Sequence, residues 1–212
     1  NDSVVNGPTH NAAGYWEFDG TDDKIVIDSL SNFAPSEVTF EAWFKKPTGS
    51  GYKGLVDKGR DNYGAYTINV DETANKATFT AKVSGVNGAV VCATEYGSNV
   101  WTHVVGTYDG TDLKIYLNGS LDGTTNLPGV LGSNTIPVTI GSTNDGLEYG
   151  GEIGEVRIYP KALTAAAVFQ NYNATKSKYI NEAPDTAPRI TDNPILINSS
   201  LLLNYGFGNR AT

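Results

Sequence analysis

The chain has 212 residues, a formal net charge of −8 and one cysteine. A single cysteine excludes an internal disulfide framework, and the length is sufficient for a β-sandwich domain with its own hydrophobic core. A general nucleic-acid surface needs clustered Lys and Arg, whereas the 15 basic residues here are scattered. No apolar run approaches the roughly 20 residues that span a membrane. We therefore expect no nucleic-acid partner and no membrane insertion.

The first residues lack the pattern of a secretion signal. The chain starts at Asn1, contains no methionine, and has neither a basic nor an apolar leader before the first strand pattern. We interpret residues 1–12 as a lead-in from a preceding segment and residues 13–178 as the folded domain.

Strand patterns with a period of two follow one another along this domain. Apolar side chains alternate with polar ones in residues 38–44, 66–70, 77–83 and 136–140, which is typical of strands with one buried face. Turns of Gly, Asn and Asp join the strands, and no long helical pattern interrupts them. The sequence predicts an all-β fold, a two-sheet antiparallel jelly-roll sandwich of about a dozen strands.

The strongest local signal is the segment WTHVVGTYDGTDLKIYLNG, residues 101–119. Asp109-Gly110 and Asn118-Gly119 are hairpin turn pairs, because mirror-image turns need the positive φ that these residues tolerate. Apolar residues alternate with Lys and Tyr between the two turns. We expect a β-meander here.

One short helix is predicted at residues 162–172, ALTAAAVFQNY, after the last strand of the domain. Thr164 is the expected N-cap, and Val168 and Tyr172 lie four residues apart on one face. We interpret Phe169 and Tyr172 as core side chains.

The end of the chain changes in composition. Residues 179–194 are rich in proline and poor in apolar anchors, as in a linker. Residues 195–212 regain strand character, and they either pair back on the edge of the sandwich or open a following domain. We favour the following domain, because a linker precedes it.

Four segments resemble the laminin-G-like domains of the concanavalin A-like jelly-roll superfamily, in its pentraxin-related branch. They are FDGTDDKIVI (18–27), FEAWFK (40–45), the 101–119 hairpin and GEIGEVRIYPKALT (151–164). The resemblance implies a jelly roll whose short C-terminal helix packs against the edge of the sandwich. The phrases QNYNATKSKY (170–179) and LLLNYGFGN (201–209) resemble segments beside such modules in virion proteins of marine bacteriophages. This implies a virion or extracellular location, with other virion or extracellular subunits as partners.

The spacing of the acidic residues indicates whether the chain could be a glycoside hydrolase. Related glucanases carry Glu-x-Asp-x-Glu or Glu-x-Asp-x-x-Glu, because retaining hydrolysis needs two carboxyl groups about 5 Å apart. The nearest approach here is Glu152 to Glu155, which lacks the aspartate and whose spacing points the two side chains to opposite faces of a regular strand. His103 lies in a strand predicted to be well packed, and we interpret it as a core histidine with a satisfied hydrogen bond. No catalytic residue is assigned.

Calcium is the one cofactor that the sequence suggests. Hard cations bind carboxylate and turn carbonyl oxygens, and Asp19 and Asp22 crowd a glycine turn. The resemblance implies that the strand after this turn lies beside the last strand, which contains Glu155. The candidate structural calcium site is therefore Asp19, Asp22 and Glu155, whereas we expect Asp23 to be exposed. Turn-capping or solvated carboxylates are the alternative interpretation.

A carbohydrate site combines aromatic side chains, which stack on sugar rings, with Asn, Asp and Gly, which bond to sugar hydroxyls. Several predicted loops have this mixture, and they form a candidate site if they converge at one rim of the sandwich. The candidate ligand-binding residues are Asn62, Tyr63, Tyr96, Asn144, Asp145, Glu148 and Tyr149.

These observations favour a non-catalytic structural or adhesive module of a larger extracellular or virion protein, of the type found in phage capsid decoration or tail fibres. A calcium-dependent lectin that recognises a cell-surface polysaccharide is the alternative. A glycoside hydrolase is a remote third possibility.

Overall fold

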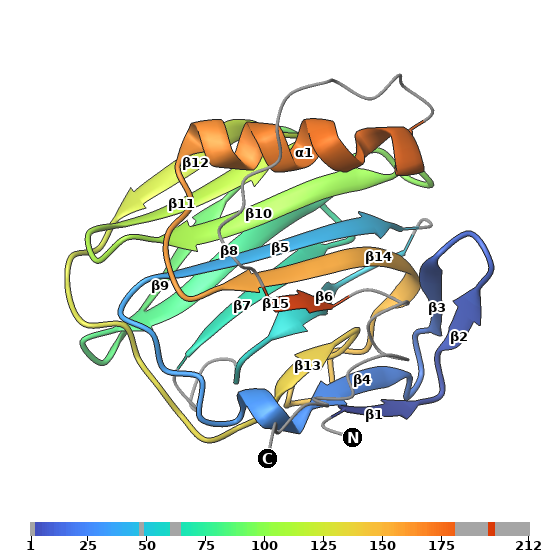
Figure 1. Ribbon diagram of the computed structural model, residues 1–212, viewed down its shortest axis with the longest axis horizontal. Helices are drawn as coiled ribbons and strands as arrows, with labels where there is room; N and C mark the ends of the chain where they lie inside the picture. The colour runs from blue at the N-terminus through green and yellow to red at the C-terminus, as the bar shows by residue number, and fades with distance from the viewer. Residues whose placement is uncertain (1–2, 47–48, 60–64, 181–194, 198–212) are drawn as a thin grey trace, which may run out of the picture.

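The computed structural model describes residues 3–46, 49–59, 65–180 and 195–197. In this part of the chain two antiparallel sheets pack face to face, and one α-helix lies against one of them (Figure 1). The predicted all-β jelly-roll sandwich with one C-terminal helix is confirmed. Within the described residues, no helix is both long and apolar enough to cross a bilayer.

The first sheet, sheet A, has seven strands whose spatial order differs from their order along the chain. A 3₁₀ turn, η1 (Asp28–Leu30), follows its second strand. In spatial order the strands are β1 (Ser3–Asn6), β4 (Lys24–Ile27), β13 (Val138–Ile140), β6 (Tyr52–Asp57), β7 (Tyr66–Asp71), β8 (Lys76–Val83) and β9 (Val86–Val91).

The second sheet, sheet B, has eight strands. Seven of them form a continuous row, and the eighth pairs with one strand of that row. The row is β12 (Ser120–Asn126), β11 (Asp112–Leu117), β10 (Thr102–Tyr108), β5 (Val38–Lys45), β14 (Gly150–Tyr159), β3 (Tyr15–Asp19) and β2 (Thr9–Asn11), and β15 (Ile195–Ile197) pairs with β14.

Strand β15 returns to the sandwich. It runs antiparallel to β14, with Ile197 opposite Val156 and Ile195 opposite Ile158. This pairing corresponds to the edge-strand alternative for the start of the 195–212 segment. Residues 181–194 and 198–212 lie outside the described residues, so the linker and domain boundaries stay a prediction.

The core lies between the two sheets and is built from the alternating apolar positions. Phe40 of β5 and Phe79 of β8 are fully buried there, and burying one such side chain is worth about 2–3 kcal/mol. Gly106 of β10 faces the Phe79 ring, which would lie 2.4 Å from a Cβ at that position. The absence of a side chain at Gly106 therefore lets sheet B approach sheet A.

The β-meander predicted at residues 101–119 is confirmed by β10, β11 and β12. Asn118 and Gly119 both adopt positive φ, 49° and 82°, as a mirror-image hairpin turn requires. At the other turn, Asp109 Oδ1 accepts hydrogen bonds from the backbone N–H groups of Thr111 and Asp112. The carboxylate therefore stabilises the turn locally.

Helix α1 (Ala165–Tyr179) follows the predicted N-cap, so it begins three residues after the start of the predicted range 162–172, and it ends seven residues later than predicted. Thr164 is the N-cap, and its hydroxyl accepts from Ala167 N at 3.2 Å. Val168 packs with Val105 in a cluster on the outer face of sheet B, so α1 covers that face and not only an edge (Figure 1). Contacts with the sheet extend the helix, and Phe169, expected in the core, is 51% exposed.

A polar layer lies between α1 and sheet B. Glu41 of β5 accepts hydrogen bonds from Arg157 (2.8 Å), from His103 Nε2 (3.1 Å) and from Asn171 of α1 (2.8 Å). His103 Nδ1 is buried and has no partner among the described residues, so the expected hydrogen bond is present at one ring nitrogen only. Glu41 links two neighbouring strands to the helix.

A second buried charge lies at the end of β6. The Lys58 side chain is fully buried, and its ammonium donates to Ser31 O (2.8 Å), to Asn134 Oδ1 (3.0 Å) and to Ile136 O. Burial lowers the pKa of Lys58 to about 8, while the nearby charge of Asp57 raises it. Lys58 therefore holds two long connections, residues 28–37 and 132–137, against the strand.

Candidate functional site

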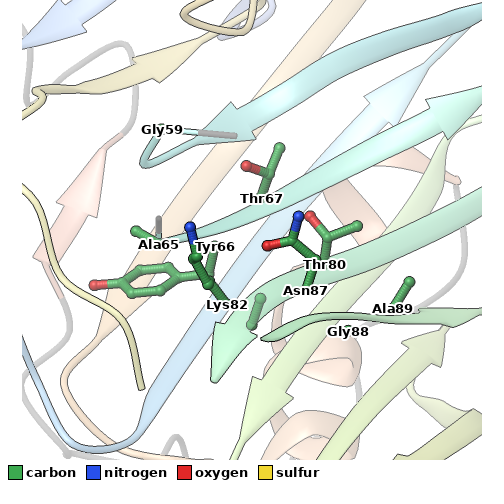
Figure 2. A pocket seen from close by; sticks show the side chains of 10 residues that line it. Gly59, Ala65, Tyr66, Thr67, Thr80, Lys82, Asn87, Gly88 and Ala89 are labelled. Atoms are coloured by element: carbon green, nitrogen blue, oxygen red, sulfur yellow. The ribbon is translucent and has the colours of Figure 1, made fainter. Parts of the chain in front are cut away.

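A pocket of about 190 Å³ lies on the outer face of sheet A, across β7, β8 and β9 (Figure 2). Side chains alternate along a strand, so the positions between the core residues Tyr66, Ile68, Phe79 and Ala81 face outward here. The strand registers arrange the outward positions in two rows. One row is Ala65, Lys82 and Asn87, and the other is Thr67, Thr80 and Ala89.

Three polar side chains in this pocket have no partner among the described residues. Thr80, Lys82 and Asn87 make no side-chain hydrogen bond or ion pair with any described residue. Figure 2 shows the Lys82 chain and the Asn87 amide on the same side of the strands. Helix α1 packs on the other sheet, so it does not cover this face. The pocket offers one cation, one amide and one hydroxyl at neighbouring positions.

Thr67 connects the pocket to a buried carboxylate. Its hydroxyl donates to Asp57 Oδ1, and Asp57 Oδ2 accepts from Asn144 N at 3.0 Å. Burial raises the pKa of Asp57, although these hydrogen bonds act in the opposite direction. With its proton given to Asp57, the Thr67 oxygen can act toward a ligand only as an acceptor.

A wider, open groove of about 440 Å³ lies at β3 and the start of β14 in sheet B. Its polar side chains are Glu17 and Asp19 of β3, Glu152 of β14, and Lys46 and Asn99. Lys46 is already paired with Glu72 at 3.0 Å, and Lys45 holds Glu152 at 2.9 Å. The groove is therefore more acidic and more open than the pocket on sheet A.

The expectation that Glu152 and Glu155 face opposite ways is wrong. A β-bulge lies between Ile153 and Val156 in β14, and it inserts an extra residue that changes the alternation. Both carboxylates consequently pair with outward-facing cations, Glu152 with Lys45 and Glu155 with Arg157. Each glutamate is held by its own cation.

The FDG turn brings three carboxylates together. Single oxygens of Asp19, Asp22 and Asp23 lie within 4.8 Å of one another. Asp23 is 6% exposed, contrary to the expectation, because its Oδ2 accepts from Asp19 N at 2.8 Å and its Oδ1 lies against Gly7. Asp19 Oδ1 also accepts from Thr21 N. Two of these aspartates therefore have turn-capping roles.

Glu155 does not join this cluster. Strand β3, which precedes the turn, pairs with β14 and places Asp19 opposite Gly150, five residues along the strand from Glu155. The strand after the turn, β4, pairs with β1 and β13 in sheet A. The strand beside β14 is therefore β3 and not β4 as expected, and Glu155 pairs with Arg157.

Two of the three candidate tyrosines are core residues and not rim residues. Tyr149 is 0% exposed and donates to Lys45 O at 2.9 Å, and Tyr96 is 4% exposed and donates to Asp71 O. Burial is the main cause that raises the pKa of Tyr149 well above its usual value. Neither ring presents a face to a sugar, because the sandwich packs around both.

The other candidate residues divide into two groups. Asn144 and Asp145 are exposed and Glu148 is half-buried, in a loop whose Asn144 N–H is tied to Asp57. Asn62 and Tyr63 lie outside the described residues. Among the described residues, Tyr96 and Tyr149 are therefore buried away from the predicted rim, and the pocket with unpartnered polar side chains lies on sheet A.

Sequence reasoning did not single out Thr80, Lys82 and Asn87. Their only signal was their position between the apolar residues of two strands, which made them outward-facing. Cross-strand register decides which outward residues are neighbours, and that information is not local in the sequence.

Residues 19–169 match a laminin-G-type family described as the Concanavalin A-like lectin/glucanases superfamily. The chain belongs to this superfamily. The match runs from the end of β3 into α1, so it includes the strands of the pocket, whereas Glu17 and Phe18 of the groove precede it. No curated protein shows significant similarity to the chain.

Solved structures confirm the superfamily fold. The binding domain of botulinum neurotoxin DC in complex with SialylT superposes with a TM-score of 0.63 at 16% identity, and covers 81% of this chain. An HCR/D variant and the botulinum neurotoxin serotype D binding domain superpose with TM-scores of 0.63 and 0.61, each at 13% identity and 80% coverage. The aligned region is 45%, 45% and 46% of those chains, respectively. Identities this low show a shared fold.

Proposed function

We propose that this superfamily member is a non-catalytic saccharide-binding module of a larger extracellular or virion protein. Its contact site is the pocket on β7, β8 and β9. Membership in a superfamily of lectins and glucanases supports the proposal, as does the similarity to toxin binding domains, one of them in complex with SialylT. The resemblance to pentraxin-related and marine phage virion modules supports the location and the partner subunits.

One observation carries the proposal. The Thr80 hydroxyl, the Lys82 ammonium and the Asn87 amide line a cavity without any partner among the described residues. Sugar hydroxyls both donate and accept hydrogen bonds, so an amide and a hydroxyl on a rigid sheet suit them. The sheet presents these groups with little loss of conformational entropy on binding.

The absence of catalysis is part of this proposal. A retaining hydrolase needs one carboxyl group free as an acid and one as a nucleophile. Here Glu152 is bound by Lys45 and Glu155 by Arg157. We expect no release of reducing ends from any polysaccharide that the domain binds.

Glycan-array binding tests the pocket. We expect Asn87→Ala to weaken binding to the best array ligand by roughly tenfold, since one hydrogen bond to a ligand is worth about 1 kcal/mol or more. Asn144→Ala is the matched control, because Asn144 is exposed on the 141–149 loop and not among the pocket-lining residues. The control should bind as the wild type does. Equal weakening by both variants, or a flat array for the wild type, would contradict the proposal.

A calcium ion at the FDG turn is a separate proposal, supported by the proximity of the Asp19, Asp22 and Asp23 carboxylates. A ligand that binds only the native state raises its stability, by about 2.7 kcal/mol at 100 times the Kd. We expect several millimolar calcium to raise the Tm of the wild type and not that of Asp22→Asn. Magnesium and sodium at matched ionic strength are the controls. An unchanged wild-type Tm in calcium would reject the ion.

A further inference from the structure

We infer that the pocket on sheet A selects acidic saccharides, with a carboxylate or sulfate group of the sugar bound at Lys82. This inference rests on the proposed saccharide-binding function and names the ligand class for the same pocket. It begins from Lys82, the one basic residue among those that line the pocket.

Lys82 is not neutralised by any residue that the structure describes. It is half-buried and makes no ion pair with any described residue, whereas Lys45, Lys46 and Lys114 are each paired with a carboxylate. The whole chain carries a net charge of −8, so an unpaired ammonium in a cavity is a local exception. A ligand anion supplies the missing counter-charge.

The neighbours of Lys82 complete a donor set. Asn87 lies directly opposite Lys82 across β8 and β9, and Cβ atoms of such pairs are about 5 Å apart. Thr80 lies two residues away on the same face, about 7 Å along the strand. A carboxylate or sulfate only accepts hydrogen bonds, and it can take a charge-assisted bond from Lys82 together with a bond from Asn87.

The buried carboxylate behind Thr67 does not compete for this site. Asp57 stands behind Thr67 and is fully buried, and its two oxygens are engaged by the Thr67 hydroxyl and by Asn144 N. Asp57 is not among the residues that line the pocket. The pocket side chains therefore present a positive and neutral surface.

The test uses matched charged and neutral sugars. The probes are an oligogalacturonate and its carboxyl-reduced form, and a sulfated galactan oligosaccharide and its desulfated form, titrated calorimetrically against the whole chain. At least one charged probe should bind about tenfold or more tightly than its neutral form, since the charge-assisted bond is lost on neutralisation. Which pair shows the difference identifies carboxylate or sulfate.

Variants assign the preference to Lys82. Lys82→Gln should abolish the difference between charged and neutral forms, and Lys82→Arg should retain it. Lys24→Gln removes a positive charge from the exposed Lys24 of β4, on the same sheet but outside the pocket, and should change nothing. A preference that survives Lys82→Gln, or equal binding of charged and neutral sugars by the wild type, would overturn the inference and leave the saccharide-binding function intact. Failure to bind any saccharide would reject both.

Discussion

Replacing Lys58 with methionine should lower the free energy of unfolding by roughly 2–4 kcal/mol. Methionine has a similar volume but cannot donate, so the carbonyl oxygens of Ser31, Asn134 and Ile136 lose the ammonium that they surround. A buried acceptor without a donor costs about 1–3 kcal/mol. Urea denaturation of Lys58→Met at pH 7 measures the loss.

The exposed Lys24 of β4 provides the control for this variant. Lys24→Met removes the same charge from the same sheet and should change stability by less than about 0.5 kcal/mol. Equal stability of Lys58→Met and the wild type would show that the carbonyl cage contributes nothing.

The loss of stability caused by Lys58→Met should grow as the pH rises. The pKa of Lys58 is about 8 in the folded protein and about 10.4 in an unfolded chain. Between these values the unfolded chain binds more protons than the folded one, so the contribution of Lys58 to stability rises with pH. The difference between wild type and variant should be larger at pH 9.5 than at pH 7.5. A difference that shrinks over this interval would contradict the lowered pKa.

Replacing Glu41 with alanine should cost about 3–5 kcal/mol, because it breaks a buried ion pair and leaves Arg157 with Glu155 as its remaining carboxylate partner. Glu41 is 1% exposed and accepts from Arg157, His103 and Asn171. Removing it breaks contacts among β5, β10, β14 and α1 together. Urea denaturation followed by tryptophan fluorescence measures the loss.

Two further variants separate charge from packing. Glu41→Gln keeps the size of the side chain and one carbonyl acceptor, so its loss should be smaller than that of Glu41→Ala. Glu95→Ala removes an exposed glutamate and should be close to neutral. If Glu41→Ala costs no more than Glu95→Ala, the layer beneath α1 does not stabilise the fold.

Lowering the pH should reduce the contribution of Glu41 to the free energy of unfolding. Burial alone would raise its pKa, but the hydrogen bond from His103 and the charge of Arg157 together lower the pKa below its usual value. A carboxylate with a lowered folded pKa stabilises the protein above its unfolded pKa of about 4.3, and this contribution is lost as the pH falls through the folded value. The difference between wild type and Glu41→Gln should therefore be full at pH 6 and decline below about pH 4. A difference that is the same at pH 6 and pH 3 would contradict this assignment.

Local patterns were enough to predict the hairpins and the fold class. The alternation in residues 77–83 and the turn pair Asn118-Gly119 depend on neighbours in the chain, and β8 and the β10–β11–β12 meander confirm them. The N-cap Thr164 was also predictable, because its hydrogen bond spans only three residues. The end of α1 was not, since contacts with a distant sheet determine it.

Local patterns predict that this chain folds as a jelly-roll sandwich of its superfamily, because strand periodicity and turn chemistry are short-range properties. Which polar residues contact one another depends on the three-dimensional packing. In the folded chain Lys82 lies opposite Asn87 in the pocket, Asp23 is buried against Gly7, and Glu155 forms an ion pair with Arg157. Strand order, register and the bulge in β14 determine these contacts. They arise from packing among residues far apart in the chain, which no local pattern records.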